Sequence, residues 1–186
     1  MRITRDHFPR LSTLPPEEQE LLEVVTDEFR TTDGGVLVSE FAETNILLVA
    51  HNEVTKRGLV GQFGDMAASL SHPDMPATGL HAFEMAVPAL QELGPTGRTH
   101  IWLGGAALGG SYGEHPRSHQ ERRYAFQRVV EAIPAPAALD SDWTIQGHDY
   151  THVRLDAEAG VLSIEFGSLS GPAGRGEMPS GPTPAA

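Results

Sequence analysis

Near the middle of the chain, two apolar runs flank a polar segment with the length of a turn. Residues 46–50 and 59–60 are apolar, and the polar segment 51–57 separates them. This order is typical of a β-hairpin. If the two strands pair symmetrically about the middle of the polar segment, Asn45 lies opposite Gln62, at a side-chain separation of about 5 Å. The pattern therefore predicts that two carboxamides meet at the open end of this hairpin.

Helical and strand patterns flank the hairpin. Apolar residues recur at helical spacing in three segments, and Pro88 in the second predicts a kink or a break into two pieces. The predicted helices span residues 14–29, 79–93 and 118–133. Short apolar or alternating runs predict further strands. These strands span residues 36–39, 101–103, 150–155 and 161–166, the last two joined by a turn that ends in Gly160.

The composition predicts one main domain with an extension at each end. A Gly-containing break at residues 31–35 separates a helical extension over residues 1–34 from the main domain over residues 35–167. Residues 168–186 are mostly Gly, Pro, Ser and Ala. We expect this last segment to be a disordered tail, because it cannot bury enough apolar surface to offset its conformational entropy.

Charge and amino-acid usage exclude several classes of function. With 13 Lys and Arg against 25 Asp and Glu, the chain carries a formal net charge of -12, which argues against a nucleic-acid partner. The absence of cysteine excludes disulfides, thiolate metal sites and a cysteine nucleophile. Residues 1–10 lack the apolar core of a signal peptide, and no run approaches the roughly 20 apolar residues of a membrane span. We therefore expect a cytoplasmic protein that does not insert into membranes.

Histidines offer weak candidates for a metal site. His115 and His119 are four residues apart with Glu114 nearby, but a proline stands between them and no third ligand follows at metal spacing. His148 and His152 share a face if their strand is regular, and such a pair usually lies at the surface. We expect no metal and no cofactor.

A Gly-rich segment around Ser111 matches the G-x-S-x-G pattern of a serine nucleophile elbow. Asp140 or Asp142 and then His148 or His152 follow in the chain order that such hydrolases use. However, an elbow needs a strand that leads directly into a helix, and here a long run of small residues precedes the serine. We favour the interpretation that these glycines serve turns and close packing.

Ser39, Asn45 and Gln62 form a third candidate set. Opposed strand positions would suit a nucleophile and the base that deprotonates it. The required chemistry is missing, since the carboxamide of Asn45 is no nucleophile and that of Gln62 cannot accept and return a proton at neutral pH. Without a base that deprotonates it, the hydroxyl of Ser39 is not activated as a nucleophile.

Four stretches of the sequence share the order and spacing of one known family. Residues 43–63, which contain ETNILLVAHN and then GQF, look like the G-S/T-C-V-A-V and G-G-M-x-H-F segments of the chemoreceptor glutamine deamidases, the CheD family. Residues 102–106, WLGGA, look like its F-G-G-A strand end, and residues 121–130 fall where its E-R-N-x-x-F helix lies. Residues 147–162 are similar to its G-G-x-x-G-R-x-V-x-F-D-x-x-x-G-x-V ending. The resemblance covers residues 36–166 and rests on order and spacing more than on identity.

The resemblance implies an α+β fold, a layered sandwich of mixed β-sheets flanked by helices. It also implies a Cys nucleophile, a His base and a Thr that orients the His, which convert receptor glutamines to glutamate under the control of a phosphatase partner. By position, the Cys falls on Asn45, the His on Gln62 and the Thr on Ser39. Because acyl transfer from glutamine needs a nucleophile and a proton shuttle, this departure predicts that deamidation is lost.

The leading hypothesis is a catalytically inactive protein-binding module of CheD-like fold. Its contact surface would include the three positions above together with Gly104, Gly105 and Ala106. Because Asn and Gln side chains both donate and accept hydrogen bonds, such a surface could hold a carboxamide or a peptide backbone. The partner would be another protein, of the chemotaxis type or a receptor.

Two alternatives stay open. The first is a hydrolase or deamidase of different chemistry on the same fold, which uses Ser39 or Ser111 with a loop histidine such as His72 or His100. A histidine ring within hydrogen-bond reach of either hydroxyl would favour it. The second is an unrelated α+β domain, in which Asn45 and Gln62 would not approach each other.

Overall fold

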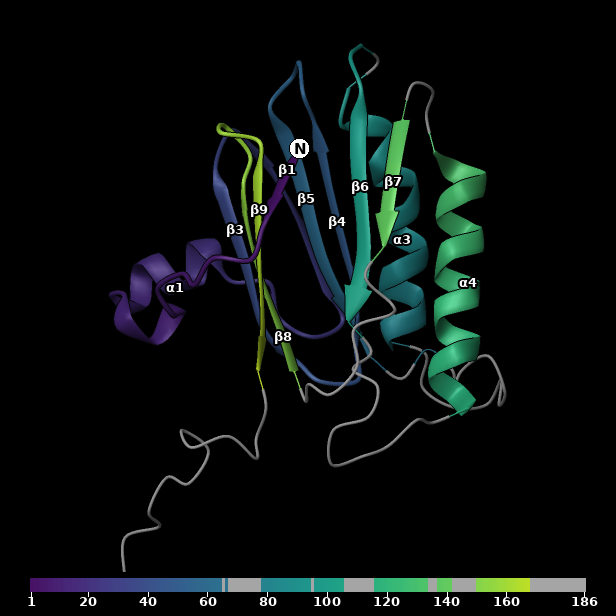
Figure 1. The fold of residues 1–186 in the computed structure, drawn as a ribbon, viewed down its shortest axis with the longest axis horizontal. Coiled ribbons are helices and arrows are strands. Elements are labelled where there is room, and N and C mark those ends of the chain that lie inside the picture. The colour runs from purple at the N-terminus through teal and green to yellow at the C-terminus, as the bar shows by residue number, and fades with distance from the viewer. Residues whose placement is uncertain are drawn as a thin grey trace, which may run out of the picture.

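Strand β4 (Ile46–Asn52) is buried along its whole length and lies at the centre of the computed structural model (Figure 1). Its side chains alternate between two apolar layers, as the geometry of a strand requires. Ile46 and Leu48 face a cluster shared with two helices, whereas Leu47 and Val49 face a cluster shared with a second sheet. A strand with two apolar faces needs a layer on each side, and this need sets the architecture.

Two sheets and a pair of helices form the three layers (Figure 1). The structure describes residues 1–64, 66, 78–94, 96–105, 116–133, 137–141 and 150–167. The five-stranded sheet has the order β2 (Glu28–Asp33), β5 (Arg57–Phe63), β4, β6 (Thr99–Gly105) and β7 (Ala137–Ser141). The four-stranded sheet has the order β1 (Arg2–Thr4), β9 (Val161–Gly167), β8 (Tyr150–Asp156) and β3 (Val36–Ala42). The two helices that cover the five-stranded sheet are α3 (Thr78–Glu92) and α4 (Pro116–Ala132).

Both sheets are mixed. The parallel pairs are β1 with β9 in one sheet and β6 with β7 in the other. The remaining ladders are antiparallel. The predicted α+β sandwich of mixed sheets flanked by helices is therefore confirmed.

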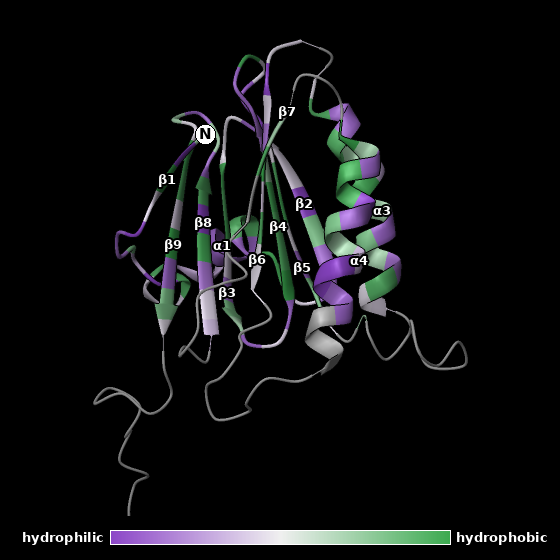
Figure 2. Ribbon diagram, turned by 45° about the vertical axis from the view of Figure 1, so that its right-hand side comes forward, coloured by the Kyte–Doolittle hydropathy of each residue, from purple (hydrophilic) through white to green (hydrophobic). Residues whose placement is uncertain are grey.

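Helix α3 joins the five-stranded sheet to α4. The fully buried ring of Phe83 meets the ring of Phe63 edge-on, with 5.2 Å between the centroids. On the other side of the helix, Glu84 accepts hydrogen bonds from Tyr124 Oη at 2.7 Å and from Arg128 Nη2 at 2.7 Å. Figure 2 shows the hydrophobic colouring of β4 beside these helices, whose surfaces carry both hydrophobic and hydrophilic residues. The helix layer is thus held by apolar packing beneath it and by an ion pair across it.

Most predicted elements lie close to their predicted bounds. Helices α3 and α4, strand β6 and the hairpin of β8 and β9 are all present, and α3 runs through Pro88 as one helix. The turn of the last hairpin ends at Gly160 with a φ of 63°, where glycine is favoured. On α4, Phe126 is 42% exposed while Glu121 is buried, so the buried face of this helix is not purely apolar. The predicted tail over residues 168–186 lies outside the described residues.

The N-terminal segment differs most from the prediction. The helix predicted over residues 14–29 is wrong beyond α1 (Pro16–Leu22), because the chain then becomes extended and Val24 N donates to Val38 O at 2.8 Å. Strand β2 continues into the five-stranded sheet, and β1 joins the four-stranded one. In this segment, hydrogen-bonded pairing with β3 and β5 is more favourable than a helix, because several of its residues are β-branched and have a low helix propensity. Residues 1–34 are therefore built into both sheets and form no separate helical extension.

The central hairpin forms as predicted, but in a different register. Leu47 lies opposite Gln62, so Asn45 precedes β4 and is not the cross-strand partner of Gln62. The turn explains the difference, because Asn52 Oδ1 accepts hydrogen bonds from two backbone amides of the loop, each at 3.0 Å. This side-chain cap favours a loop over residues 53–56 and so fixes which strand positions face each other.

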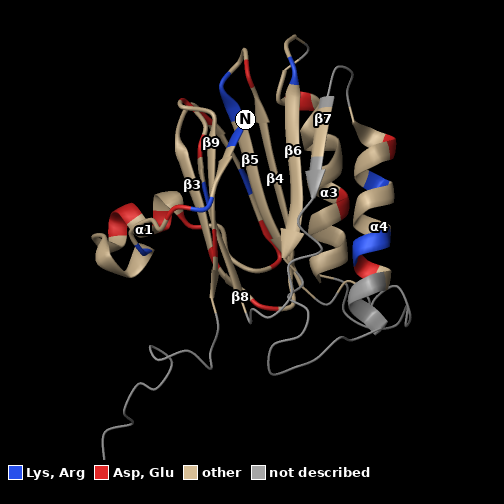
Figure 3. Cartoon of the chain, in the orientation of Figure 1, with Lys and Arg blue, Asp and Glu red and all other residues tan. Residues whose placement is uncertain are grey.

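Charged residues are unevenly distributed over the elements (Figure 3). They lie on α1, on α4 and near the ends of strands, whereas β4 and β6 contain no Asp, Glu, Lys or Arg. Among the helices of the described residues, none combines the length and the apolar character needed to cross a membrane.

We expect Phe83→Ala to lower the free energy of unfolding by about 3–5 kcal/mol, because it removes a fully buried ring and leaves a cavity beneath α3. Met85 on the same helix is the matched control. It is 54% exposed, so Met85→Ala should change the free energy of unfolding by less than about 0.5 kcal/mol. Urea unfolding followed by circular dichroism measures both, and equal losses would contradict this placement of the helix.

Candidate functional site

Ser39 and Gln62 meet between the two sheets. Ser39 lies on β3 opposite Val153, and Gln62 lies on β5 opposite Leu47, so both side chains point into the apolar layer that the sheets share. Ser39 Oγ donates a hydrogen bond to Gln62 Oε1 at 2.5 Å. Ser39 is fully buried and Gln62 is 3% exposed. This polar contact therefore joins the two sheets in a place where an unpaired carboxamide would be costly.

Thr26 extends the contact toward the surface. Gln62 Nε2 donates to Thr26 Oγ1 at 3.1 Å, and Asn45 Nδ2 donates to the same oxygen at 3.2 Å. The structure thus places Ser39, Gln62 and Asn45 in one hydrogen-bonded network, in which Asn45 is connected to Gln62 through the Thr26 hydroxyl and does not face it across the strands as predicted. Thr26 follows α1 and belongs to none of the elements that the sequence predicts for the site. The signal that could have identified its region is the run of β-branched residues at 24–26, which is unfavourable for a helix.

The outer end of this network has free hydrogen-bonding capacity. The hydroxyl oxygen of exposed Thr26 accepts both bonds, which leaves its hydrogen available to donate outward. Half-buried Asn45 uses Nδ2, and within the described part of the chain its Oδ1 accepts no hydrogen bond. One donor and one acceptor therefore lie next to each other at the surface.

Asp27 holds the strands around this network in place. It has a left-handed backbone with a φ of 63°, which Asp tolerates better than most residues, and its N donates to Gln62 O at 2.7 Å. Its carboxylate accepts from Gly64 N at 2.9 Å and from Thr78 Oγ1 at 2.7 Å. One side chain thus ties the end of β5 to the start of α3.

Gly105 borders the network through the backbone of Asn45. Its φ is 79°, and a Cβ there would lie 2.3 Å from Asn45 O, so only glycine allows this approach. A Cβ at Gly104 would instead lie 2.1 Å from the ring of Trp102, so this glycine makes room for the core. Ala106, the third predicted contact residue, lies outside the described residues.

Ser39 has no histidine base among the residues that the structure describes. Of the five histidines whose side chains are described, His81 is exposed on α3 and each of the other four is bonded to a different group. The pairs are His7 Nδ1 with Glu165 Oε2 at 2.8 Å, His51 Nε2 with Ala157 O at 2.8 Å, His100 Nε2 with Glu53 Oε2 at 3.3 Å, and His152 Nδ1 with Phe41 N at 3.0 Å. The described histidines therefore do not support a hydrolase built on Ser39. Ser111 and His72 lie outside the described residues.

His152 is buried, so the expectation of a surface histidine is wrong. It is 0% exposed, and the rings of Phe41 and Tyr150 each lie with centroids 4.7 Å from its own. Burial, with a smaller contribution from the charge of Arg10, lowers the pKa of His152 to about 4. Its Nδ1 accepts a hydrogen bond from the backbone of Phe41, whose φ of 56° is strained for an aromatic residue. The neutral ring thus holds a bulge in β3 close to the site.

Acidic and histidine side chains do not converge on a metal site in the described ranges, where no group of three or more could hold an ion. No family model and no curated protein matches the chain. The similarity to the CheD family therefore stays a prediction from motif order, to be judged by the chemistry of the site.

We expect Ser39→Ala to lower the free energy of unfolding by about 1–3 kcal/mol, because it leaves the buried Gln62 Oε1 without its donor. Adding Gln62→Met removes the unpaired carboxamide and should recover part of this loss. A double-mutant cycle from urea unfolding should give a coupling of at least about 0.5 kcal/mol. Ser12→Ala, at an exposed serine, is the control and should have little effect. Strict additivity of the two site substitutions would contradict the bond.

Stability should depend on pH through His152. Its pKa is about 4 when folded against 6.5 for an ordinary histidine, so the unfolded chain binds more protons between these values. The free energy of unfolding should fall as pH is lowered from about 6.5 to about 4, by at most about 1.4 kcal/mol per pH unit from this group. His152→Asn keeps an acceptor near Phe41 N but does not titrate, so it should reduce the slope. An unchanged slope in pH-dependent urea titrations would contradict this role.

Proposed function

We propose that the chain is a CheD-like protein-binding module that has lost glutamine deamidase chemistry. The observation that carries the proposal is the state of Gln62, which takes the place of the family's histidine base. Its carboxamide is buried and hydrogen-bonded at both ends, to Ser39 and to Thr26. The serine at the position of the family's orienting threonine thus contacts the residue at the position of the histidine, as the resemblance would require.

The same residues argue against deamidation. Hydrolysis of a glutamine side chain through an acyl-enzyme needs a nucleophile and a group that moves protons near neutral pH. Asn45 provides neither, and a carboxamide such as that of Gln62 does not titrate in this range. Of the three positions that the resemblance assigns to such a site, two therefore carry residues, Asn45 and Gln62, that cannot supply its chemistry.

The binding role rests on the donor and acceptor at the surface end of the network. The Thr26 hydroxyl can donate and Asn45 Oδ1 can accept, which complements a carboxamide or one peptide unit, since each offers one C=O and at least one N–H. We infer that the partner is a protein that presents such a group, of the chemotaxis type or a receptor. A cytoplasmic location is part of the same proposal.

Ammonia release tests the loss of chemistry. Purified protein incubated with a glutamine-containing receptor peptide should release no more ammonia than the peptide alone, because both the nucleophile and the proton shuttle are absent. In the same assay, Asn45→Cys combined with Gln62→His restores the family's residue types. Release by the double variant above the unaltered chain would support the CheD-like arrangement, and robust turnover by the unaltered chain would refute the proposal.

Binding is tested with N-acetylglutamine methylamide as the probe. Its addition should shift the NMR signals of Thr26 and of the Asn45 side-chain amide. Thr26→Ser keeps the hydroxyl and should keep the response, whereas Thr26→Val should lose it. Thr31→Val, at another exposed threonine of this region, is the control and should respond like the unaltered chain. Equal responses from Thr26→Val and Thr31→Val would contradict the proposed contact.

A further inference from the structure

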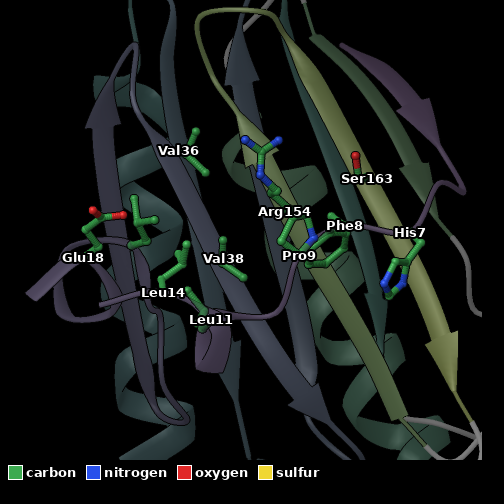
Figure 4. Close-up of a pocket in the computed structure, with 11 residues that line it drawn as sticks. His7, Phe8, Pro9, Leu11, Leu14, Glu18, Val36, Val38, Arg154 and Ser163 are labelled. Atoms are coloured by element: carbon green, nitrogen blue, oxygen red, sulfur yellow. The ribbon is translucent and has the colours of Figure 1, made fainter. Parts of the chain in front are cut away.

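A hollow of about 640 Å³ lies on the outer face of the four-stranded sheet (Figure 4). The N-terminal segment forms its cover, with Leu11, Leu14 and Leu22 among the lining side chains. Val36 and Val38 of β3 form part of its floor. Its size is within the range of small-molecule sites, and its lining is mainly apolar with few polar groups, as in such sites.

Two polar side chains of the hollow, Arg154 and Ser163, lie in one row across the sheet. Val38 on β3 lies opposite Arg154 on β8, and Arg154 lies opposite Ser163 on β9. Directly opposed residues on one face lie about 5 Å apart, so the guanidinium and the hydroxyl are neighbours. Figure 4 shows Arg154 between Val38 and Ser163, with Glu18 beyond the two valines on the far side. The cationic end of the hollow thus adjoins an apolar stretch.

Both polar side chains of this row have donors to spare. The carboxylate of Asp156 is 3.8 Å from Arg154 Nη2, beyond hydrogen-bond distance, and within the described residues the guanidinium makes no hydrogen bond. Ser163 Oγ accepts from Thr4 Oγ1 at 3.2 Å, which leaves its own hydrogen free. Glu165 nearby is already paired with His7 and Arg10. The row therefore presents several donors and a positive charge.

We propose that this hollow binds a small apolar carboxylic acid. The planar guanidinium of Arg154 matches a carboxylate with two parallel hydrogen bonds, and Ser163 can donate a further one. The hydrocarbon part would lie along Val36 and Val38 under the leucines of the N-terminal segment, away from water. This site is separate from the Ser39 network, because successive residues of β3 point to opposite faces of the sheet.

Isothermal titration of the full chain with octanoate tests the proposal, with octan-1-ol as the uncharged probe of similar length. Octanoate should bind saturably and about tenfold or more tightly than octan-1-ol, since hydrogen bonds between charged groups are stronger than those between neutral groups. This comparison needs no variant. Equal affinities for the two probes, or no saturable octanoate binding, would overturn the proposal.

Arg154→Met keeps an apolar stem and removes the charge, so it should weaken octanoate binding about tenfold and leave octan-1-ol binding nearly unchanged. Arg30 is a close match for the control. Its side chain is 38% exposed against 32% for Arg154, and each lies 3.8 Å from a carboxylate oxygen, but Arg30 is on the other sheet. Arg30→Met should bind octanoate like the unaltered chain. Equal weakening by both substitutions would mean that net charge, and not the hollow, attracts the acid.

Discussion

The burial of β4 on both faces is the constraint on which the rest of the structure depends. Apolar side chains on one face require helices α3 and α4, and those on the other require the four-stranded sheet. Both layers pack on the apolar side chains of this strand, because an apolar sheet face has to be buried against another element. Its neighbour β5 places the buried polar side chain of Gln62 opposite Leu47, in the layer between the two sheets.

Gln62 is held by residues from two separate parts of the chain, strand β3 and the segment that follows α1. Ser39 comes from the opposite sheet, Thr26 from the segment after α1, and the backbone of Asp27 binds the Gln62 carbonyl. A buried polar network that is fully satisfied specifies one arrangement of its parts, whereas a half-satisfied one destabilises the fold. Such a network can therefore persist for structural reasons alone, whatever chemistry the site carries out.

The periodic elements could be predicted from the sequence, and the contacts that complete the site could not. Helix α3 and the hairpin of β8 and β9 have a clear period, so local pattern was sufficient. The end of α1 depends on pairing with β3, and the hairpin register depends on the Asn52 cap, which are both tertiary or side-chain effects. The role of Thr26 could not be predicted because it depends on a tertiary contact, in which the segment after α1 lies against the side chain of Gln62. His152 was misplaced because the strand pattern alone does not show that a bulge and two aromatic rings would cover it.

The parallel pairing of β1 with β9 has a consequence for synthesis on the ribosome. Thr4 and Ser163, which share a hydrogen bond across these strands, are 159 positions apart in the chain. Strand β3 likewise gains its pairing partner only after β8 has been synthesised. Contacts between residues so far apart in the chain form late in folding, since the entropy cost of closing the loop between them must be overcome first. The nascent chain would therefore expose the apolar inner face of its five-stranded sheet until the last hairpin emerges, and exposed apolar surface of this kind favours aggregation.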